Sequence, residues 1–285
     1  GQIAKLFGSI AAKMPGLVTK IGLGTFIDPR IEGGRLNGRT PNDLVEVVTL
    51  RGEEYLLYHS FPIDIGFIRG TYADQEGNIS IEQEAAHLEM LPLAMAVHNS
   101  GGKVFAQVKE VVDTENILAK SVVVPGYLVD YIVVANDFDK EHRQCGEVTY
   151  DPCYSGEKKK VLGIDKLTGS LIRKIISQRA TKELRNGNII NLGQGIPTDI
   201  IPILCQHPTL SNVHYTVESG VSGGIPNAVP DFGISSNPES MIRQDDMFTF
   251  YNGGGLDITF LGFAEVDAQG NVNVSNFGNR AGECG

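Results

Sequence analysis

The feature of this sequence that most constrains its fold is a long internal repeat. Residues 58–81 align with residues 251–274 at a single offset of 193 and without a gap. The identical pairs are Tyr58/Tyr251, Asp64/Asp257, Ile65/Ile258, Phe67/Phe260, Asp74/Asp267, Gly77/Gly270 and Asn78/Asn271. Each copy predicts a buried strand, a turn in which Asp, Gly and Asn supply the local hydrogen bonds and the positive φ, and an alternating strand. A repeat of this spacing indicates a duplicated domain, because solenoid units recur every roughly 20–50 residues.

Both copies alternate predicted strands with predicted helices, which is typical of α/β domains. In the first copy, residues 46–58 predict a hairpin around Arg51-Gly52, residues 63–68 a buried strand, and residues 84–98 a helix. In the second copy, an apolar stripe at helical spacing starts at Leu171, and residues 188–192 predict a short strand. We therefore predict two tandem homologous α/β domains. The predicted bounds are 1–136 for the first domain, 137–166 for a linker and 167–285 for the second domain.

The same offset leads us to expect that both domains are incomplete. The first-copy counterpart of residues 167–197 would fall before residue 1 or at the start of the chain. The second-copy counterpart of residues 91–112 would fall at the end of the chain and beyond residue 285. We interpret the chain as the central part of a longer polypeptide, and we expect this part alone to be weakly stable and nearly inactive.

Composition narrows the classes of partner. The formal net charge is −10 and the isoelectric point is near 5.1, which argues against nucleic acid or an anionic membrane as the main partner. No apolar run reaches the roughly 18 residues of a membrane-spanning helix. The cysteines at 145, 153, 205 and 284 show no paired spacing, and the histidines form no metal-binding motif. We expect no metal, no membrane and a cytoplasmic location.

Glu218 is the residue whose setting most strongly suggests chemistry. It follows the β-branched and aromatic run that begins at Tyr215, and Gly220, Gly223 and Gly224 come directly after it. A carboxylate at the carboxyl end of a strand lies where α/β sheets bind ligands, and glycine lets the backbone approach a ligand closely. Taken alone, the segment is also compatible with a surface glutamate before a glycine-rich turn.

Two further glycine-rich segments are candidate binding loops. Gly193, Gln194 and Gly195 separate a predicted strand from a predicted helix, so their amides could meet an anionic group. A tight turn between strand and helix explains them equally well. Gly254 lies in a run of glycines that replaces Ser60-Phe61-Pro62 of the first copy, which favours close approach of a ligand.

Together these segments resemble family I CoA-transferases, and most closely their single-chain acetate/propionate branch. The resemblance covers essentially the whole chain. It rests on the following five segments: Thr216–Gly224, Asn191–Pro197, Gly22–Arg30, Pro125–Tyr131 and Gly253–Asp257. It implies two fused CoA-transferase halves and a covalent role for Glu218. It also implies that Gly193, Gln194 and Gly195 line the pocket for CoA and the acyl group, and that Gly285 begins a loop near the oxyanion.

The resemblance implies transfer of CoA between an acyl-CoA and a carboxylate through an acyl-glutamyl anhydride and a glutamyl-CoA thioester. A carboxylate can attack a thioester when it is positioned and partly desolvated, and the thioester energy is conserved throughout. We therefore expect no tightly bound cofactor, with coenzyme A as substrate and covalent intermediate. The expected acids are short, such as acetate, propionate or butyrate, and the expected assembly is a homo-oligomer. The alternatives are an acyl-CoA thioesterase, a non-catalytic sensor or binding domain, and an inactive fragment.

Overall fold

The computed structural model describes residues 1–35, 39–40, 43–163, 170–207, 209–274, 276–277 and 280–281. Helices and strands alternate along the chain, which confirms the α/β class. Among the described residues, no sheet combines strands from the first 136 residues with strands from the region after residue 170. The two regions are called the first half and the second half below. Their relation as homologous domains, and the proposed domain bounds, stay predictions.

The first half contains a parallel sheet, a mixed sheet and a separate antiparallel sheet. Strand order is β10-β7-β4 in the parallel sheet, β8-β5-β6-β9 in the mixed sheet and β1-β3-β2 in the antiparallel sheet. Its elements, with the short helix that follows it, are α1 (Gln2–Ala11), β1 (Gly16–Thr19), β2 (Val45–Leu50), β3 (Glu53–His59), β4 (Ile65–Arg69), β5 (Tyr72–Asp74), β6 (Ile79–Ser80), α2 (Met90–Asn99), β7 (Lys103–Val108), β8 (Glu110–Val112), η1 (Thr114–Asn116), η2 (Ala119–Ser121), β9 (Val122–Val124), η3 (Gly126–Leu128), β10 (Tyr131–Val134) and α3 (Phe138–Glu141).

Helix α2 covers one face of the parallel sheet with small side chains. Ala94, Ala96 and Val97 are fully buried, and a Cβ at Gly66 of β4 would lie 2.7 Å from Val97. The predicted helix over 84–98 is wrong at its start, because α2 begins at Met90. Pro92 explains the difference: proline is tolerated in the first turn of a helix, whereas farther inside it removes a backbone hydrogen bond. Leu88 has φ 51° in the turn before the helix.

The second half is built on a five-stranded sheet of order β16-β13-β12-β11-β17. Strands β12, β11 and β17 are parallel, and β13 and β16 run antiparallel beside them. The elements are α4 (Leu171–Thr181), β11 (Ile189–Leu192), η4 (Ile196–Ile200), α5 (Ile201–Leu204), β12 (His214–Thr216), β13 (Val221–Ser222), β14 (Ile225–Pro226), β15 (Ser235–Ser236), β16 (Ser240–Met241), α6 (Gln244–Asn252), β17 (Ile258–Phe260), β18 (Glu265–Val266), β19 (Val272–Asn273), β20 (Asn276–Phe277) and β21 (Arg280–Ala281).

The two faces of this sheet differ in polarity. Ile190 and Leu192 of β11 join Ile200, Ile201 and Leu204 of η4 and α5 in an apolar core. Helix α6 lies at the opposite face, where the central strands present polar side chains. The predicted helix near residue 171 exists as α4, but its apolar side chains Leu171 and Ile172 are 73% and 70% exposed.

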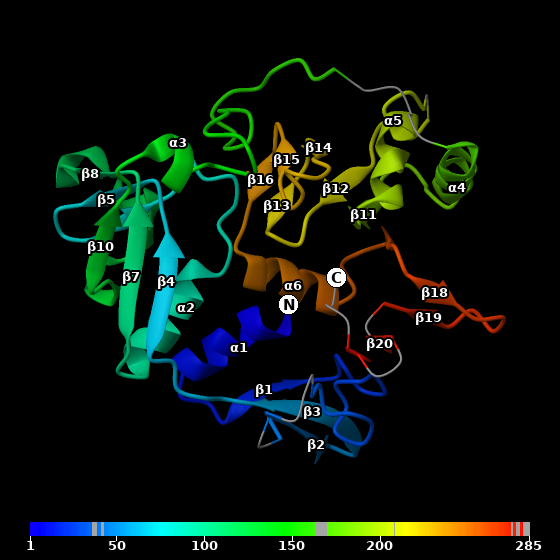
Figure 1. Cartoon of the computed structure of the whole chain (residues 1–285), viewed down its shortest axis with the longest axis horizontal. Helices are drawn as coiled ribbons and strands as arrows, with labels where there is room; N and C mark the ends of the chain where they lie inside the picture. The colour runs from blue at the N-terminus through cyan, green and yellow to red at the C-terminus, as the bar shows by residue number, and fades with distance from the viewer. Residues whose placement is uncertain are drawn as a thin grey trace.

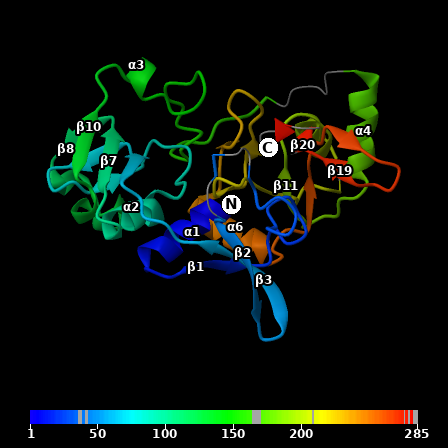
Figure 2. The ribbon, with the colours of Figure 1, turned by 60° about the horizontal axis from the view of Figure 1, so that its bottom comes forward.

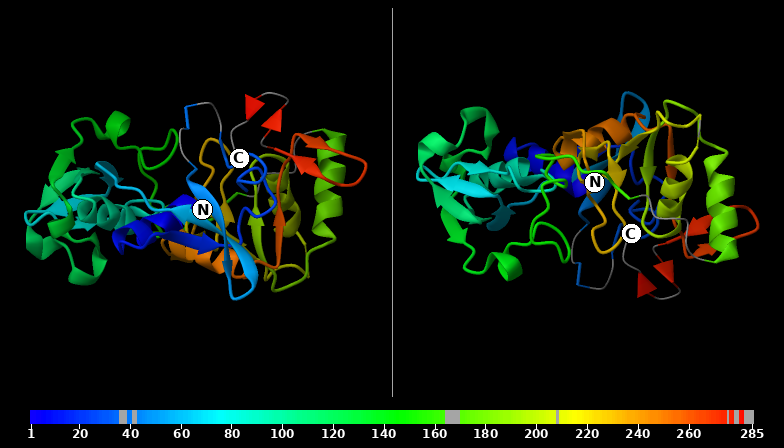
Figure 3. Two further views of the ribbon diagram at one scale, coloured as in Figure 1. Left: turned by 90° about the horizontal axis from the view of Figure 1, so that it is seen from below. Right: turned by 90° about the horizontal axis from the view of Figure 1, so that it is seen from above.

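The halves meet through α1 and α6, which lie side by side in the middle of the molecule (Figure 1). The hairpin of β2 and β3 extends away from this centre (Figure 2), and its position around Arg51-Gly52 is as predicted. The hairpin of β18 and β19 lies at the periphery of the second half (Figure 3). In the described ranges, no helix has the length and apolar character needed to cross a membrane.

Candidate active site

The carboxyl ends of β12, β11 and β17 bring two of the predicted site segments to one edge of the sheet. Thr216, Asn191 and Thr259 are paired across these three strands. Glu218 follows β12, and Gly193 follows β11, so both lie just beyond that row of paired residues. Ligands of open α/β sheets bind at this edge.

Glu218 occupies a tight turn between β12 and β13. The N–H of Gly220 donates to the carbonyl of Val217 at 3.0 Å, and the N–H of Val217 donates to the carbonyl of Val221 at 2.8 Å. Gly220 has φ 104°, and a Cβ there would lie 1.9 Å from the carbonyl oxygen of Ile242. Glycine is therefore required at position 220 by both backbone conformation and space.

The turn fixes the backbone while leaving the carboxylate of Glu218 available. Ser219 is buried and donates its hydroxyl to the carbonyl of Gly233 at 2.6 Å, while Val217 and Val221 are buried on either side. In the part of the chain that the structure describes, no hydrogen bond or ion pair holds the Glu218 carboxylate. The side chain is partly exposed. A carboxylate in this setting is free to meet a substrate.

A row of hydrogen-bonded polar groups lies on the strands that end at this turn, and two of them, Thr216 and Asn191, are buried. Tyr251 of α6 donates its hydroxyl to Thr216 Oγ1 at 2.8 Å, and Thr216 Oγ1 donates to the carbonyl of Ile190 at 2.9 Å. Asn191 Nδ2 donates to the carbonyl of Thr216 at 3.3 Å, and Thr259 donates to Asn191 Oδ1 at 3.1 Å. These bonds tie the end of β12 to its neighbours.

Tyr251 is also electrostatically close to Glu218. Burial raises the pKa of Tyr251 to about 12, and the negative charge of Glu218 adds to the increase, while the hydrogen bond with Thr216 opposes it. The phenol is therefore neutral over the pH range in which carboxylates act as nucleophiles.

The loop at 193–195 has the geometry of a turn from strand to helix with open space on one side. Gly193 donates its N–H to the carbonyl of Phe260 at 2.8 Å. Gly195 has φ 91°, its carbonyl accepts a hydrogen bond from the Thr198 hydroxyl at 2.7 Å, and a Cβ there would meet nothing within 4 Å. Gln194 is exposed. The hydrogen bonds are those of a tight turn, and the open space at Gly195 leaves room for a ligand. The loop is therefore compatible with both interpretations.

Gly223 and Gly224 pack against protein. A Cβ at Gly223 would lie 2.5 Å from the Glu239 side chain, and one at Gly224 would lie 2.2 Å from the carbonyl oxygen of Ser236. The N–H of Gly223 donates to the carbonyl of Tyr215. Gly223 therefore lies beside β12, the strand that precedes the Glu218 turn. Close packing alone accounts for glycine at both positions, and a contact with substrate stays a prediction.

Gly254 ends helix α6. Its N–H donates to the carbonyl of Tyr251 at 3.0 Å, the N–H of Gly255 donates to the carbonyl of Phe250 at 2.9 Å, and φ of Gly254 is 89°. This is the Schellman arrangement, in which glycine at the left-handed position closes a helix. Because Gly254 precedes β17 whereas Glu218 follows β12, and these strands run in parallel register through β11, the structure does not bring the two residues to one edge of the sheet.

Gly285 lies outside the described residues, as does Cys284, so the predicted oxyanion loop has no structural description. In the described ranges, no cluster of His, Cys, Asp and Glu side chains could hold a metal ion.

The first half reaches the Glu218 turn through the segment before α2. The N–H of Gln244, at the start of α6, donates to the carbonyl of Leu88 at 3.2 Å. Ile242 donates its N–H to the carbonyl of Gly220 at 2.9 Å. Glu89 and Glu218 both lie within electrostatic range of residue 1. Glu89 therefore lies in the same neighbourhood as Glu218.

The halves also share a cavity of about 420 Å³. Its lining includes His87 and Lys120 from the first half, Ser155 from the connecting segment, and Glu239 and Met241 from the second half. A volume of this size falls within the range of small-ligand pockets. A molecule bound there would touch both halves.

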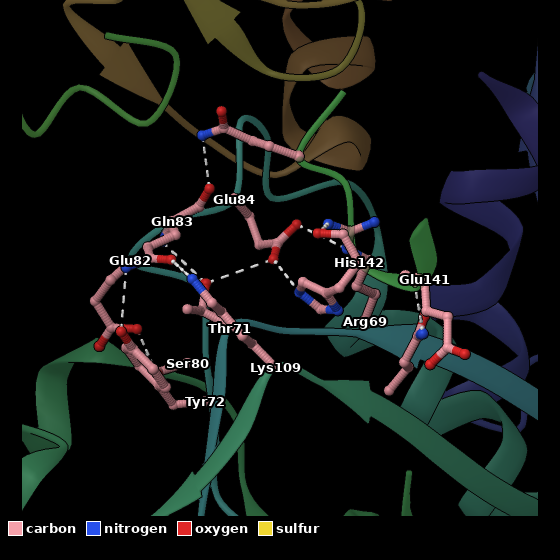
Figure 4. A network of polar contacts seen from close by, with 12 residues as sticks. Arg69, Thr71, Tyr72, Ser80, Glu82, Gln83, Glu84, Lys109, Glu141 and His142 are labelled. Atoms are coloured by element: carbon pink, nitrogen blue, oxygen red, sulfur yellow. Dashed lines mark hydrogen bonds and ion pairs between the residues drawn. The ribbon is translucent and has the colours of Figure 1, made fainter. Parts of the chain in front are cut away.

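Away from the Glu218 turn, a largely buried cluster of charged side chains holds the segment after β10 against β4 (Figure 4). The carboxylate of Glu84 lies 3.0 Å from Nε of Arg69 and 3.1 Å from Nε2 of His142, which is buried. Thr71 and Gln83 extend this network, with the N–H of Gln83 donating to the Thr71 hydroxyl at 2.9 Å. Glu84 also lines the cavity shared by the two halves, and its contacts with Arg69 and His142 hold that part of the cavity wall together.

The residues missed at the level of sequence are Tyr251, Thr216, Asn191 and Thr259. Tyr251 was identified only as part of the repeat. Its counterpart in the first copy, Tyr58, donates its hydroxyl to the carbonyl of Ile21, whereas Tyr251 donates to Thr216. A signal for Asn191 was present, because an amide inside an apolar strand is uncommon unless it is hydrogen-bonded. Thr216 lies two residues before Glu218, so the sequence placed it on the preceding strand. The sequence did not reveal that its hydroxyl is hydrogen-bonded to Tyr251.

The chain is similar to coenzyme A transferases. Residues 1–135 match the family model described as coenzyme A transferase. The similarity to CoA-transferases extends over nearly the whole chain, as the resemblance of its motifs implied.

Two proteins illustrate the similarity. The chain is 45% identical to caffeate CoA-transferase of Acetobacterium woodii over 277 residues, which is 97% of this chain and 53% of that protein. It is 38% identical to the acetate CoA-transferase YdiF of Escherichia coli O157:H7 over 281 residues, with 97% and 52% covered. The crystal structure of the YdiF apoenzyme superposes with a TM-score of 0.86 over 98% of this chain and 52% of that one. The chain thus spans about half the length of the curated relatives that it matches.

Proposed function

We propose that the whole protein transfers coenzyme A from an acyl-CoA to a carboxylate, with Glu218 as the nucleophile. The observation that carries the proposal is the position of Glu218. It lies in a rigid turn at the carboxyl edge of parallel strands, with a carboxylate that no described residue engages. The names of the two relatives described above support the reaction class.

In the first half-reaction, a carboxylate oxygen of Glu218 attacks the thioester carbonyl of the acyl-CoA. The C–S bond breaks, CoA leaves as a thiolate, and an acyl-glutamyl anhydride forms. The thiolate then attacks the Glu218 carbonyl carbon, which forms glutamyl-CoA and releases the first acid as its carboxylate. The electrons of each broken bond remain with the departing sulfur or oxygen, so no oxidant, ATP or metal takes part.

In the second half-reaction, the acceptor carboxylate attacks the glutamyl-CoA carbonyl and displaces the CoA thiolate. A new anhydride forms, and the thiolate attacks its acyl carbonyl, which gives the new acyl-CoA and restores Glu218. Each tetrahedral intermediate carries an oxyanion that needs hydrogen-bond donors, and removal of one donor from comparable sites costs roughly 3–4 kcal/mol. The N–H of Gly193 is taken by the carbonyl of Phe260, so the amides of Gln194 and Gly195, together with the one at Gly285, are the proposed donors.

The proposed substrates are acyl-CoA thioesters and carboxylic acids, with short acids such as acetate, propionate and butyrate as the first to test. The relatives named for acetate and for caffeate differ greatly in the size of the acid, so the panel should include an aromatic acrylate. Coenzyme A serves as substrate and covalent intermediate, without a tightly bound cofactor. We also propose a cytoplasmic homo-oligomer.

Covalent labelling tests the proposal. The whole protein is incubated with acyl-CoA in the absence of an acceptor, digested and analysed by mass spectrometry. CoA should be found on the peptide that carries Glu218, and Glu218→Gln should abolish both the label and the transfer while leaving the unfolding transition unchanged. A label found only on a cysteine, such as Cys205, would refute the proposed nucleophile.

Steady-state kinetics give a second test. The first acid must leave before the acceptor attacks, so double-reciprocal plots should give parallel lines. Intersecting lines would indicate a ternary complex and direct transfer.

Two alternatives make different predictions for the same protein. An acyl-CoA thioesterase would release free CoA at the same rate with and without an acceptor acid, whereas a transferase forms new acyl-CoA only when the acceptor is present. A sensor or binding domain would bind CoA with equal affinity before and after Glu218→Gln and would catalyse neither reaction.

A further inference from the structure

The turn that carries Glu218 is bonded to a hairpin, and that hairpin is held in turn by the segment between the two halves. Strands β14 and β15 form the hairpin and pair Ile225 with Ser236 and Pro226 with Ser235. The connecting segment comprises residues 137–163. It contacts the hairpin at two places, the loop at residues 227–234 and the residue that follows β15.

Ser219 makes the contact between the turn and the hairpin. It is buried, and its hydroxyl donates to the carbonyl of Gly233 in the hairpin loop at 2.6 Å. A hydroxyl has a single proton to donate, so this bond prevents Ser219 from donating at the same time to the Glu218 carboxylate or to an oxyanion. The geometry of Ser219 therefore suits the positioning of its neighbour Glu218, and not a direct part in the reaction.

The hairpin loop is bonded within itself. The N–H of Asn227 donates to the carbonyl of Ile234 at 2.9 Å, and the N–H of Asp231 donates to the carbonyl of Ala228 at 2.9 Å. Ile234, next to Gly233, is buried. These bonds leave the loop few ways to change its shape, so a shift at Asp231 also shifts the carbonyl that Ser219 holds.

The connecting segment packs closely on the loop at Gly146. This residue has φ 46°, and a Cβ there would lie 2.4 Å from Asp231 Oδ1 and 3.3 Å from the carbonyl oxygen of Pro230. Asp231 Oδ1 is buried and accepts no hydrogen bond from the described residues, so packing against Gly146 places this carboxylate. The hydroxyl of Tyr154 lies 3.4 Å from Asp231 Oδ2, which is too long to hold the loop.

The same segment holds the other end of the hairpin through Asn237, the residue after β15. The N–H of Asn237 donates to the carbonyl of Cys153 at 2.8 Å. Its side chain makes two more bonds, because Nδ2 donates to the carbonyl of Lys160 at 2.8 Å and Oδ1 accepts from the N–H of Lys160 at 3.0 Å. The connecting segment therefore fixes the hairpin at both ends.

We propose that Ser219 is a positioning residue for Glu218, and that it transmits to the nucleophile the position that the connecting segment imposes on the hairpin. This inference rests on the proposed role of Glu218. The connecting segment is bonded to the first half as well, since Gln144 Nε2 donates to the carbonyl of Gln83 at 2.7 Å. Loss of the Ser219 bond lowers the rate of attack by the Glu218 carboxylate more than it weakens binding of acyl-CoA, because the rate depends steeply on the placement of the reacting atoms.

A double-mutant cycle on the whole protein tests the proposal, with the single-turnover rate of CoA labelling at Glu218 as the measurement. Ser219→Ala should lower this rate about tenfold and change the steady-state KM for acyl-CoA less than about twofold. Ser219→Thr keeps the hydroxyl and should restore most of the rate. Gly146→Ala should lower the rate severalfold in the wild-type protein and should have no further effect in Ser219→Ala, because both substitutions act through one bond.

Two further variants complete the cycle. Gly163→Ala is the matched control in the connecting segment, because a Cβ there would meet nothing within 4 Å, and it should leave the rate unchanged. Asn237→Ala removes the two side-chain bonds to Lys160 and takes the place of Gly146→Ala if that variant does not fold. Its effect on the rate should likewise disappear in Ser219→Ala.

Amide hydrogen exchange gives a measurement that does not depend on the reaction. The N–H groups of Val217 and Gly220 are hydrogen-bonded across the turn and should exchange faster in Ser219→Ala. Absence of the label in the wild-type protein would overturn the proposed function and this inference together. If the wild type is labelled, equal rates for wild type and Ser219→Ala, or effects of Ser219→Ala and Gly146→Ala that multiply, would overturn this inference alone.

Discussion

The hydroxyl of Tyr251 donates to Thr216 Oγ1 at 2.8 Å, and Thr216 lies on the strand that ends at the Glu218 turn. Helix α6 is thereby fastened to the central sheet beneath the candidate nucleophile. Thr216 in turn donates to the carbonyl of Ile190 on the neighbouring strand, so the two hydroxyl groups link three elements of the second half.

Tyr251→Phe should therefore weaken both stability and transfer without abolishing either. A typical buried hydrogen bond contributes about 1 kcal/mol to the free energy of unfolding, and Thr216 keeps its bond to Ile190 in the variant. We expect a loss of about 1 kcal/mol in urea unfolding and a severalfold decrease in the transfer rate. Tyr154→Phe is a suitable control, because its hydroxyl makes a long contact of 3.4 Å with Asp231. An equal decrease in rate for both variants would contradict a specific role for Tyr251.

Gly220→Ala should be strongly destabilising. The φ of 104° disfavours any side chain, and the new Cβ would lie 1.9 Å from the Ile242 carbonyl oxygen. We expect a loss of more than about 2 kcal/mol together with loss of covalent labelling at Glu218, because the turn must move.

Gly52→Ala separates the two causes. Gly52 also has a positive φ, 84°, but a Cβ there would meet nothing within 4 Å. This variant should lose about 1 kcal/mol from backbone strain alone and keep its transfer activity. If the two variants lost the same free energy in denaturant unfolding, the collision with Ile242 would have no energetic role.

Glu84→Gln should destabilise the first half by about 2–3 kcal/mol. The substitution leaves the cation of Arg69 without its carboxylate in a largely buried site, and loss of one partner from a buried pair is costly. The exposed pair of Arg143 and Glu147 supplies the control, because surface ion pairs contribute roughly 0–1 kcal/mol. Glu147→Gln should change the urea midpoint little. Equal shifts in midpoint for the two variants would show that burial of the Glu84 cluster is unimportant.

Asp28 should make stability depend on pH in the acid range. Hydrogen bonds from the Arg30 guanidinium, together with backbone donors at Gly24 and Arg30, hold the pKa of Asp28 well below its ordinary value of 3.8. The carboxylate therefore stabilises the fold above pH 3.8, and this contribution decreases as the pH falls below 3.8 toward the lower pKa of the folded state.

The measurement compares the wild-type chain with Asp28→Asn by denaturant unfolding between pH 7 and pH 3. The difference in unfolding free energy should be constant at neutral pH and should shrink below pH 3.8. A difference that stays constant over the whole range would mean that Asp28 does not bind its proton differently in the folded and unfolded chains.

The parts of the fold that were predicted correctly are those set by local periodicity. Apolar runs identified β4 and β11, and Arg51-Gly52 identified the hairpin of β2 and β3, because alternation and turn residues act over short distances. The start of α2 was missed although Pro92 was visible, because the apolar pattern continued through the turn that contains Leu88. Local pattern does not reveal where a chain adopts a strained φ.

The candidate site was predictable only in part for a different reason. The position of Glu218 at a strand end follows from the order of residues, and so does the nearby loop at Gly193. The roles of Gly223, Gly224 and Gly254 depend on what packs against them: Glu239, Ser236 and the end of α6. These are tertiary contacts, so glycines that close a helix and glycines that could face a ligand look alike in sequence.

The contact between Leu88 and Gln244 has a mechanical consequence for Glu218. The carbonyl of Gly220 accepts a hydrogen bond from Ile242, and Gln244, two residues later at the start of α6, donates to the carbonyl of Leu88 in the first half. The backbone between these two bonds is therefore fixed at one end to the Glu218 turn and at the other end to the first half. The position of the candidate nucleophile thus depends on the segment at 84–89, which does not contact it through any described hydrogen bond.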